Sequence, residues 1–235
     1  KSTTAVNLAL ALAAEGARRE RSRLYVVMEY ANGGDLARRL KGGPLSQLEV
    51  VRIGLDVARG IAAIAQAGIV HFDLKPENIM VRAGQYVLGD FGVADARGSA
   101  TIPLRSEVWG TAAYLAPEYI TRAQTIPGKS DLYSFGVTLY QALAGENPFA
   151  AERAASAMFC QVHFQPPSLA SLHDGVDLAL SDLIDTLLAK APENRPTPEV
   201  AVAAFARLQE RFAMEPERAV PLVMPSIARE MIPDR

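Results

Sequence analysis

Four polar residues in the middle of the chain could do chemistry together. Asp73, Lys75 and Asn78 lie close to one another in the run HFDLKPEN, and Asp90 follows in the run GDFG. Carboxylate and amide oxygens suit a hard divalent cation, and a lysine ammonium is a compact charge that can compensate an anion. Apolar stretches surround all four residues. This context favours one shared site over a scatter of ordinary surface residues.

Five short motifs, in this order, resemble those of the protein kinases, of the serine/threonine type common in bacteria. They are HFDLKPEN at 71–78, DFG at 90–92, APE at 116–118, SDLYSFG at 130–136 and NRP at 194–196. The resemblance extends from about Arg23 to Phe212. Five signatures in the correct order are far more specific than any one of them. The resemblance implies transfer of the ATP γ-phosphoryl group, with Mg²⁺, to Ser or Thr of protein substrates.

The resemblance also assigns roles to the four polar residues. Asp73 orients the substrate hydroxyl and accepts its proton, and Lys75 neutralises the transferred phosphate. In the family a lysine at this position accompanies Ser/Thr substrates. Asn78 and Asp90 are the expected Mg²⁺ ligands, and Asp90 is expected to ligate the Mg²⁺ that lies between the β- and γ-phosphates.

The resemblance places the adenine site before and after the catalytic loop. Met28, Glu29, Tyr30 and Ala31 match the hinge, whose backbone contacts adenine, and Met80 matches the floor of the site. Core packing is an equally compatible interpretation for the two methionines.

Several further residues match structural positions of the family. His71 is expected to pack beneath the catalytic loop and could bond Asp131, and Phe91 is expected to set the direction of Asp90. Glu118 and Arg195 match a buried ion pair. The stretch 109–111, which contains Trp109, resembles the segment that positions substrate, although plain packing also explains this tryptophan.

One residue of the catalytic loop departs from the family. An arginine often stands between the histidine and the aspartate and holds a phosphate of the activation segment, but Phe72 stands there in this chain. An aromatic ring cannot pair a phosphate bidentately. We therefore expect that phosphorylation of Ser99, Thr101 or Ser106 does not switch activity through Phe72.

The residues before the hinge depart further. A protein kinase covers ATP with a small lobe of strands and a helix, which carries a glycine-rich loop and a lysine that clamps phosphates. Such a lobe needs roughly 60 residues, but only 27 precede Met28 and they contain no glycine-rich loop. The small lobe is therefore expected to be largely missing. The chain could then be a truncated or inactive kinase, and a non-catalytic kinase-like binding module is the alternative.

The first 19 residues, KSTTAVNLALALAAEGARR, resemble another family. They are similar to the helix that follows the phosphate-binding loop of partitioning-type P-loop ATPases, in which Lys1 would be the phosphate-binding lysine. The glycines that should precede this lysine are absent. A relic of a fusion is the favoured interpretation, a helix packed where the small-lobe helix would lie is another, and a P-loop ATPase fragment is the remote alternative.

Composition excludes several classes of protein. The chain is 49% apolar and 21% charged, so it can bury a core. A net charge of −2 gives no general polyanion-binding signature, and no nucleic-acid partner is expected. Cys160 is the only cysteine, which suits a reducing compartment, and we expect a cytoplasmic protein. No apolar run approaches the roughly 20 residues that cross a bilayer.

Apolar periodicity and capping residues predict the elements. We expect helices over 3–20, 46–67, 130–145, 176–190 and 197–212, and a buried strand over 23–30. The segment 93–128 is expected to be irregular, after short strands near the catalytic loop.

The fold class that follows is mainly α with a small β component, a protein-kinase-like C-terminal lobe whose N-terminal lobe is largely missing. We expect an N-terminal helix over 1–22, the kinase hinge and C-terminal lobe over 23–212, and a proline-rich tail or linker over 213–235.

Overall fold

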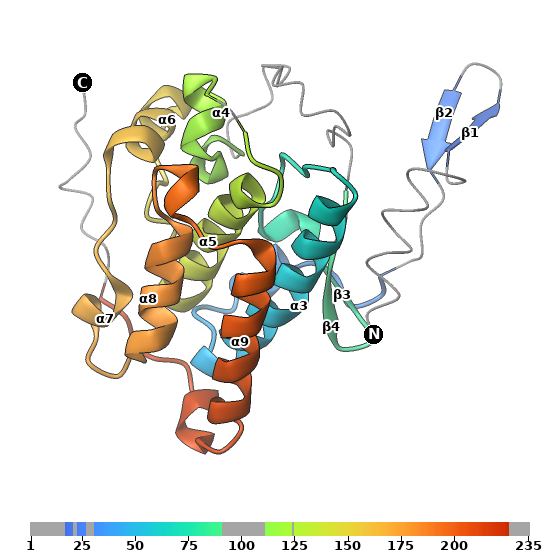
Figure 1. Ribbon diagram of the computed structural model, residues 1–235. Helices are drawn as coiled ribbons and strands as arrows, with labels where there is room; N and C mark the ends of the chain where they lie inside the picture. The colour runs from blue at the N-terminus through green and yellow to red at the C-terminus, as the bar shows by residue number, and fades with distance from the viewer. Residues whose placement is uncertain (1–16, 21–22, 27–30, 91–110, 124, 226–235) are drawn as a thin grey trace.

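The computed structural model describes residues 17–20, 23–26, 31–90, 111–123 and 125–225 (Figure 1). These residues form a mostly helical body with two short two-stranded sheets. The family's large lobe, expected from the motifs, is confirmed. Of the expected site residues, Met28, Glu29 and Tyr30 lie outside the described residues, as do Phe91 and Trp109.

The N-terminal segment contains a hairpin. β1 (Ala17–Glu20) pairs antiparallel with β2 (Arg23–Val26), from Ala17 opposite Val26 to Glu20 opposite Arg23. The helix expected over 3–20 is therefore wrong at 17–20, because these residues pair their backbone with a strand rich in β-forming residues. Its remaining residues lie outside the described part of the chain, as do residues 27–30 of the expected strand.

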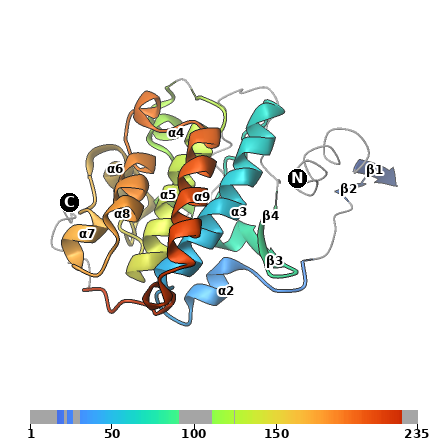
Figure 2. The ribbon, with the colours of Figure 1, turned by 60° about the horizontal axis from the view of Figure 1, so that its bottom comes forward.

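Three long helices form the centre of the body. α3 (Gln47–Gln66) and α9 (Pro198–Phe212) pack side by side, and α5 (Lys129–Ala144) packs against α3 and α8 (Leu178–Leu187) (Figures 1 and 2). Nearly every residue of α5 is buried. A helix that is apolar around its whole circumference is expected at the middle of a domain, and this expectation is confirmed.

Local chemistry sets the ends of these helices. The Ser46 hydroxyl accepts a hydrogen bond from the Glu49 N–H at 3.2 Å and starts α3. After α3, Gly68 takes a left-handed φ of 70° that favours glycine. Thr197 caps α9, whose first residue is Pro198. These boundaries agree with the sequence expectations within one or two residues.

The α3–α9 contact depends on a missing side chain. A Cβ added at Gly54 in α3 would lie 2.4 Å from the ring of Phe205 in α9. The Phe205 ring in turn packs against Phe135 of α5, with 6.5 Å between ring centroids. Gly54 therefore lets the two helices approach closely around one buried aromatic ring.

Shorter elements complete the lobe. They are α2 (Leu36–Leu40), α4 (Pro117–Thr121), α6 (Ala154–His163), α7 (Leu169–Leu172) and the 3₁₀ turns η1 (Pro76–Asn78), η2 (Thr111–Tyr114), η3 (Pro192–Asn194) and η4 (Pro216–Ala219). Of these, α2, α4, α6 and α7 were not expected from the sequence, and the expectation of an irregular segment over 93–128 is wrong at 117–121, where α4 forms. These helices are too short to show a long stretch of apolar residues at helical spacing, although their apolar residues pack against the core.

A small sheet lies beside the catalytic loop. β3 (Ile79–Arg82) and β4 (Gln85–Leu88) form an antiparallel hairpin. On the other side of β3, the Gly33 N–H donates to the Val81 carbonyl at 2.9 Å, and the Val81 N–H donates to the Gly34 carbonyl at 2.8 Å. The segment that follows the hinge is thereby held against β3.

The segment after α9 contacts the helical body. Arg218 of η4 donates to the Gly175 carbonyl at 3.1 Å and pairs with Asp177 at 3.5 Å. Ser46 forms an isolated antiparallel bridge with Pro221. Residues up to Pro221 thus pack near the start of α3 and of α8.

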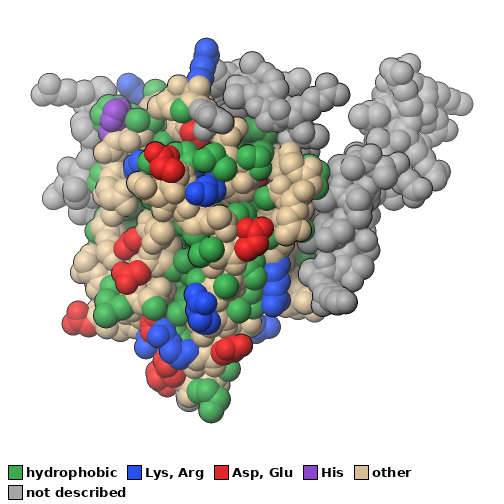
Figure 3. Space-filling view, viewed as in Figure 1, with side chains coloured by type: hydrophobic (Ala, Val, Ile, Leu, Met, Phe, Trp, Pro, Cys, Tyr) green, Lys and Arg blue, Asp and Glu red, His purple; other side chains and the backbone are tan. Residues whose placement is uncertain are grey.

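The surface drawn in Figure 3 carries both signs of charge. Among the described residues on this face, Lys and Arg side chains are interspersed with Asp and Glu. None of the described helices combines the length and the apolar character that crossing a membrane requires.

Candidate active site

The catalytic loop is held from below by a buried carboxylate. The N–H groups of His71 and Phe72 donate to Asp131, at 3.0–3.2 Å, and Asp131 is 1% exposed at the start of α5. Burial raises the pKa of the Asp131 carboxyl, and the nearby His71 and the two N–H donors oppose that shift. The expected bond between His71 and Asp131 is therefore present, and it is made by the main chain.

The His71 ring links the loop to the following motif. Its Nε2 lies 2.9 Å from the Gly89 carbonyl oxygen, immediately before Asp90. His71 is fully buried. The ring is therefore packed in the interior, and it contacts the residue that precedes the DFG motif.

Asp73, Lys75 and Asn78 converge on one another. The Asn78 Nδ2 donates to the Asp73 carbonyl at 2.7 Å and to its Oδ2 at 3.0 Å. The Lys75 Nζ lies 3.0 Å from the same Oδ2. η1, which begins with Pro76, turns the chain so that Asn78 faces back to Asp73. The three expected catalytic residues are therefore brought together.

The two oxygens of Asp73 differ in their surroundings. Oδ2 accepts from Asn78 and pairs with Lys75, whereas Oδ1 is buried and has no hydrogen-bond partner within the described part of the chain. A buried acceptor without a partner is costly and rare in folded proteins. Such an oxygen is suited to receive a proton from a bound hydroxyl group.

Asp90 lies next to Asn78 because of the β3–β4 register. Ile79 pairs with Leu88, and the Gly89 N–H donates to the Asn78 carbonyl at 2.8 Å. Asp90 is exposed, with a left-handed φ of 50° that is uncommon outside glycine. Strained backbone of this kind clusters at functional sites. The hairpin thus delivers the second expected metal ligand beside the first.

The oxygens of Asn78 and Asp90 fit Mg²⁺. The Asn78 amide nitrogen is engaged by Asp73, which directs the amide so that its oxygen remains for a cation. Mg²⁺ typically takes one or two protein oxygens and completes its shell with phosphates and water. The described residues contain no group of three or more His, Cys, Asp or Glu that could hold a metal by themselves. Such a donor set suits a cation that arrives with a nucleotide.

On the adenine side, two expected residues are described. Ala31 is half-buried and begins the segment that pairs with β3. Asp35 of this segment lies opposite Met80 of β3. A Cβ added at Gly89 would lie 2.8 Å from the Met80 Cγ. Met80 therefore lies between the segment after the hinge and the residue before Asp90.

Phe72 has a packing role in this loop. Its side chain is buried, with a φ of 66°, and its ring lies 5.1 Å from that of Tyr119 in α4. Where related loops carry an arginine, this loop carries an apolar contact to the helix after APE. Ser99, Thr101 and Ser106 lie outside the described residues, so the expectation that their phosphorylation does not act through Phe72 stays a prediction.

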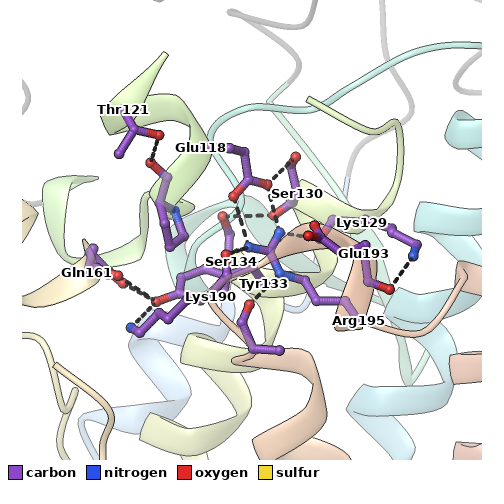
Figure 4. A network of polar contacts seen from close by, with 12 residues as sticks. Glu118, Thr121, Lys129, Ser130, Tyr133, Ser134, Gln161, Lys190, Glu193 and Arg195 are labelled. Carbon is purple, nitrogen blue, oxygen red and sulfur yellow. Dashed lines mark hydrogen bonds and ion pairs between the residues drawn. The ribbon is translucent and has the colours of Figure 1, made fainter. Parts of the chain in front are cut away.

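The expected ion pair of Glu118 and Arg195 is buried and bidentate (Figure 4). The two guanidinium NH₂ groups lie 2.7 and 2.8 Å from the two carboxylate oxygens, and both side chains are essentially unexposed. The Ser130 hydroxyl donates to Glu118 at 2.5 Å. The pair fixes α4, at the end of the activation segment, to the start of α5 and to the chain after η3.

A second polar network was missed by sequence reasoning. Lys190 donates to the Tyr133 hydroxyl at 2.9 Å, and that hydroxyl donates to Gln161 Oε1 at 2.6 Å (Figure 4). Burial, with the charge of Arg195 as a second cause, lowers the pKa of Lys190 to about 8. The one signal in the sequence is a glutamine inside the apolar run AMFCQVHF.

Comparison with known proteins agrees with this geometry. Residues 10–205 match the protein kinase domain family. The chain is 36% identical to a probable serine/threonine-protein kinase pknA2 of Bifidobacterium longum over 181 residues, which is 76% of this chain and 24% of that protein. It is 36% identical to the serine/threonine-protein kinase PknL of Mycobacterium tuberculosis over 200 residues, 84% of this chain and 50% of that protein. It is also 36% identical to PknB of Mycobacterium leprae over 174 residues, 73% and 28% of the two chains.

The fold and the site define a protein kinase lobe, and the chain belongs to the protein kinase family, of the bacterial serine/threonine type. It spans half or less of the length of these relatives.

Proposed function

We propose that this chain transfers the γ-phosphoryl group of ATP to Ser or Thr hydroxyls of proteins. The observation that carries the proposal is the environment of Asp73: Asn78 and Lys75 hold its Oδ2, while its Oδ1 is buried and has no hydrogen-bond partner among the described residues. Phosphoryl transfer needs an aligned hydroxyl and charge compensation more than covalent help.

Each side chain has one task in this proposal. Asp73 Oδ1 accepts the hydrogen bond and then the proton of the substrate hydroxyl, while Lys75 lies close enough to Asp73 to compensate charge on the transferred group. Asn78 and Asp90 would hold Mg²⁺, which when bound to ATP bridges the phosphates and offsets their charge. Ala31 and Met80, with Met28 and Glu29, would contact adenine.

The substrate class and location follow from the same features. A lysine at position 75 supports Ser/Thr acceptors in protein substrates. The single cysteine, Cys160, is buried and supports a reducing, cytoplasmic setting. The balanced charge supports the proposal that nucleic acid is not a partner.

Asp73→Asn tests the proposal. Mg-ATP binding is measured by calorimetry, and phosphate transfer to a general protein substrate is measured with labelled ATP. We expect Asp73→Asn to retain nucleotide binding and to lower the transfer rate by about 100-fold or more, since a general base contributes at least that much.

The control is Asp174→Asn, the same chemical change at an exposed loop residue. Equal activity of wild type and Asp73→Asn contradicts the proposal, and a wild-type chain without transfer favours the non-catalytic binding module. Nucleotide hydrolysis that is lost in Lys1→Ala and kept in Asp73→Asn would favour the P-loop ATPase alternative.

A further inference from the structure

A buried glutamine holds the turn that precedes the APE motif. Gln161 in α6 is 0% exposed, and its Nε2 donates to the Ala113 carbonyl at 2.6 Å. Its Oε1 accepts from the Tyr133 hydroxyl at 2.6 Å. Both ends of the amide are therefore used, one by η2 and the other by α5.

The network behind Gln161 fixes the direction of its amide. Tyr133 is fully buried, and its hydroxyl accepts from Lys190 Nζ at 2.9 Å. That ammonium also lies 5.4 Å from the centroid of the Tyr133 ring and 4.5 Å from that of Phe149. Because the Tyr133 hydroxyl oxygen accepts a hydrogen bond from Lys190, its own hydrogen points to Gln161 Oε1. The amide Nε2 is then left to face Ala113.

Other contacts converge on the same turn. The Asn147 Nδ2 also donates to the Ala113 carbonyl, at 3.3 Å, and the Tyr114 hydroxyl donates to Gln141 at 2.5 Å. Polar side chains from α5, from α6 and from the loop between them thus hold two consecutive residues of η2. An apolar side chain could fill the space of Gln161 without the cost of burying an amide. What the amide adds is a fixed position for one backbone carbonyl.

The turn lies beside the catalytic loop. Phe72, next to Asp73, packs against Tyr119, which follows the turn by a few residues. Burial raises the pKa of Tyr114 to about 12, and the carboxylate of Glu77 in η1 adds to that shift. The chain just before Ala113 corresponds to the stretch that resembles the substrate-positioning segment.

We propose that Gln161 is a positioning residue for the acceptor peptide, which it aligns by fixing the Ala113 carbonyl and thereby the turn of η2 that precedes the APE motif. The inference rests on the proposed kinase function. It predicts that a change at Gln161 weakens binding of the protein substrate but not of the nucleotide. The reason is that the residues expected at the adenine site, Met80 in β3 and the segment that pairs with β3, do not belong to η2.

The test compares Gln161→Leu with a matched control. Gln47→Leu removes another buried glutamine whose amide donates to the Gly175 carbonyl at 3.0 Å and accepts from the Asp177 N–H at 2.8 Å, near the starts of α3 and α8. We expect Gln161→Leu to raise the KM for an acceptor peptide about tenfold, as the loss of roughly one buried hydrogen bond would. Its kcat should stay within about twofold, and its KM for ATP should not change.

A second measurement does not depend on activity. Hydrogen exchange of the backbone amides in 111–119 should be faster in Gln161→Leu than in wild type, and unchanged in Gln47→Leu. If the wild-type chain transfers no phosphate, the proposed function fails, and the exchange data alone still decide whether Gln161 holds the turn.

The inference is overturned if both glutamine variants shift the peptide KM equally, or if exchange in 111–119 is the same in Gln161→Leu and wild type. Should Gln161→Leu fail to fold, Tyr133→Phe takes its place, since it removes only the hydroxyl that orients the amide. For Tyr133→Phe, a rise in the peptide KM, even one below tenfold, supports the inference. An unchanged peptide KM together with unchanged exchange in 111–119 overturns it.

Discussion

Breaking the buried ion pair from one side should remove a large part of the stability of the fold. The five N–H groups of Arg195 all donate, to both oxygens of Glu118 and to the carbonyls of Ala189, Lys129 and Lys190. Glu118→Gln keeps the shape of the side chain but removes its charge and turns an NH₂ group toward the guanidinium. Removing one partner of a buried pair costs about 3–5 kcal/mol, because the other charge stays buried without compensation.

The expected shift is large enough to measure directly. A chain of this length loses roughly 2–4 °C of melting temperature for each kcal/mol, so Glu118→Gln should lower Tm by roughly 6–20 °C. Thermal unfolding followed by far-UV circular dichroism, at neutral pH and moderate salt, gives the value. Urea unfolding gives the same difference as a free energy.

The control is a second bidentate Arg–Glu pair that is far more exposed. Arg39 donates to the two carboxylate oxygens of Glu49 at 3.1 and 2.9 Å, but its side chain is 51% exposed. Arg39→Gln should therefore cost less than about 1 kcal/mol. Equal losses in Glu118→Gln and Arg39→Gln would refute the reasoning. The double variant Glu118→Leu with Arg195→Met should recover part of the loss, since it leaves no buried charge.

Three further predictions concern the core. Burial holds the pKa of Lys190 at about 8, below its ordinary 10.5, so between these pH values the unfolded chain binds more protons and the free energy of unfolding rises with pH. In urea unfolding, wild type should therefore gain stability relative to Lys190→Met as pH rises from about 8 to 10. The same pH dependence in both proteins would count against this prediction. Gly54→Ala should lower the free energy of unfolding by about 1–3 kcal/mol, because the added Cβ meets the Phe205 ring, and a urea midpoint equal to that of wild type contradicts the expectation. Phe72→Ala removes the contact with Tyr119 and should cost about 3–5 kcal/mol in the same assay, whereas a loss below about 1 kcal/mol would show that the ring does not pack as described.

The long helices could be predicted because their signals are local. The Ser46 hydroxyl caps α3 by accepting from the Glu49 N–H, an apolar residue recurs at every turn, and Gly68 ends the helix. These features depend on hydrogen bonds between residues that are only a few positions apart in the sequence. The hairpin β1–β2 is different, since Ala17–Glu20 is rich in helix-forming residues and becomes a strand only through pairing with β2.

The residues of the candidate site, Asp73, Lys75, Asn78 and Asp90, could be predicted from motifs in the sequence, but their geometry could not. The sequence indicates that Asp73 and Asn78 belong together, whereas the Asn78 amide bond to Asp73, and the different surroundings of the two Asp73 oxygens, depend on how η1 turns the chain. Gln161 and Ala113 lie 48 positions apart. No periodicity or cap relates such residues, so only the packing of α6 on η2 reveals their contact.

One turn of a buried helix connects these observations. At the start of α5, Ser130 bonds Glu118 at the end of the activation segment. Asp131 bonds the N–H groups at the start of the catalytic loop, and Tyr133 bonds Gln161, which holds the turn at η2. The position also suits Asp131, since the first turn of a helix favours a negative charge. The catalytic loop and the two segments beside it are therefore all fixed to α5, in which nearly every residue is buried. A change in α5 that breaks the Asp131 contact should for this reason disturb the catalytic loop, whereas a change that breaks the Tyr133 contact should disturb the turn at η2.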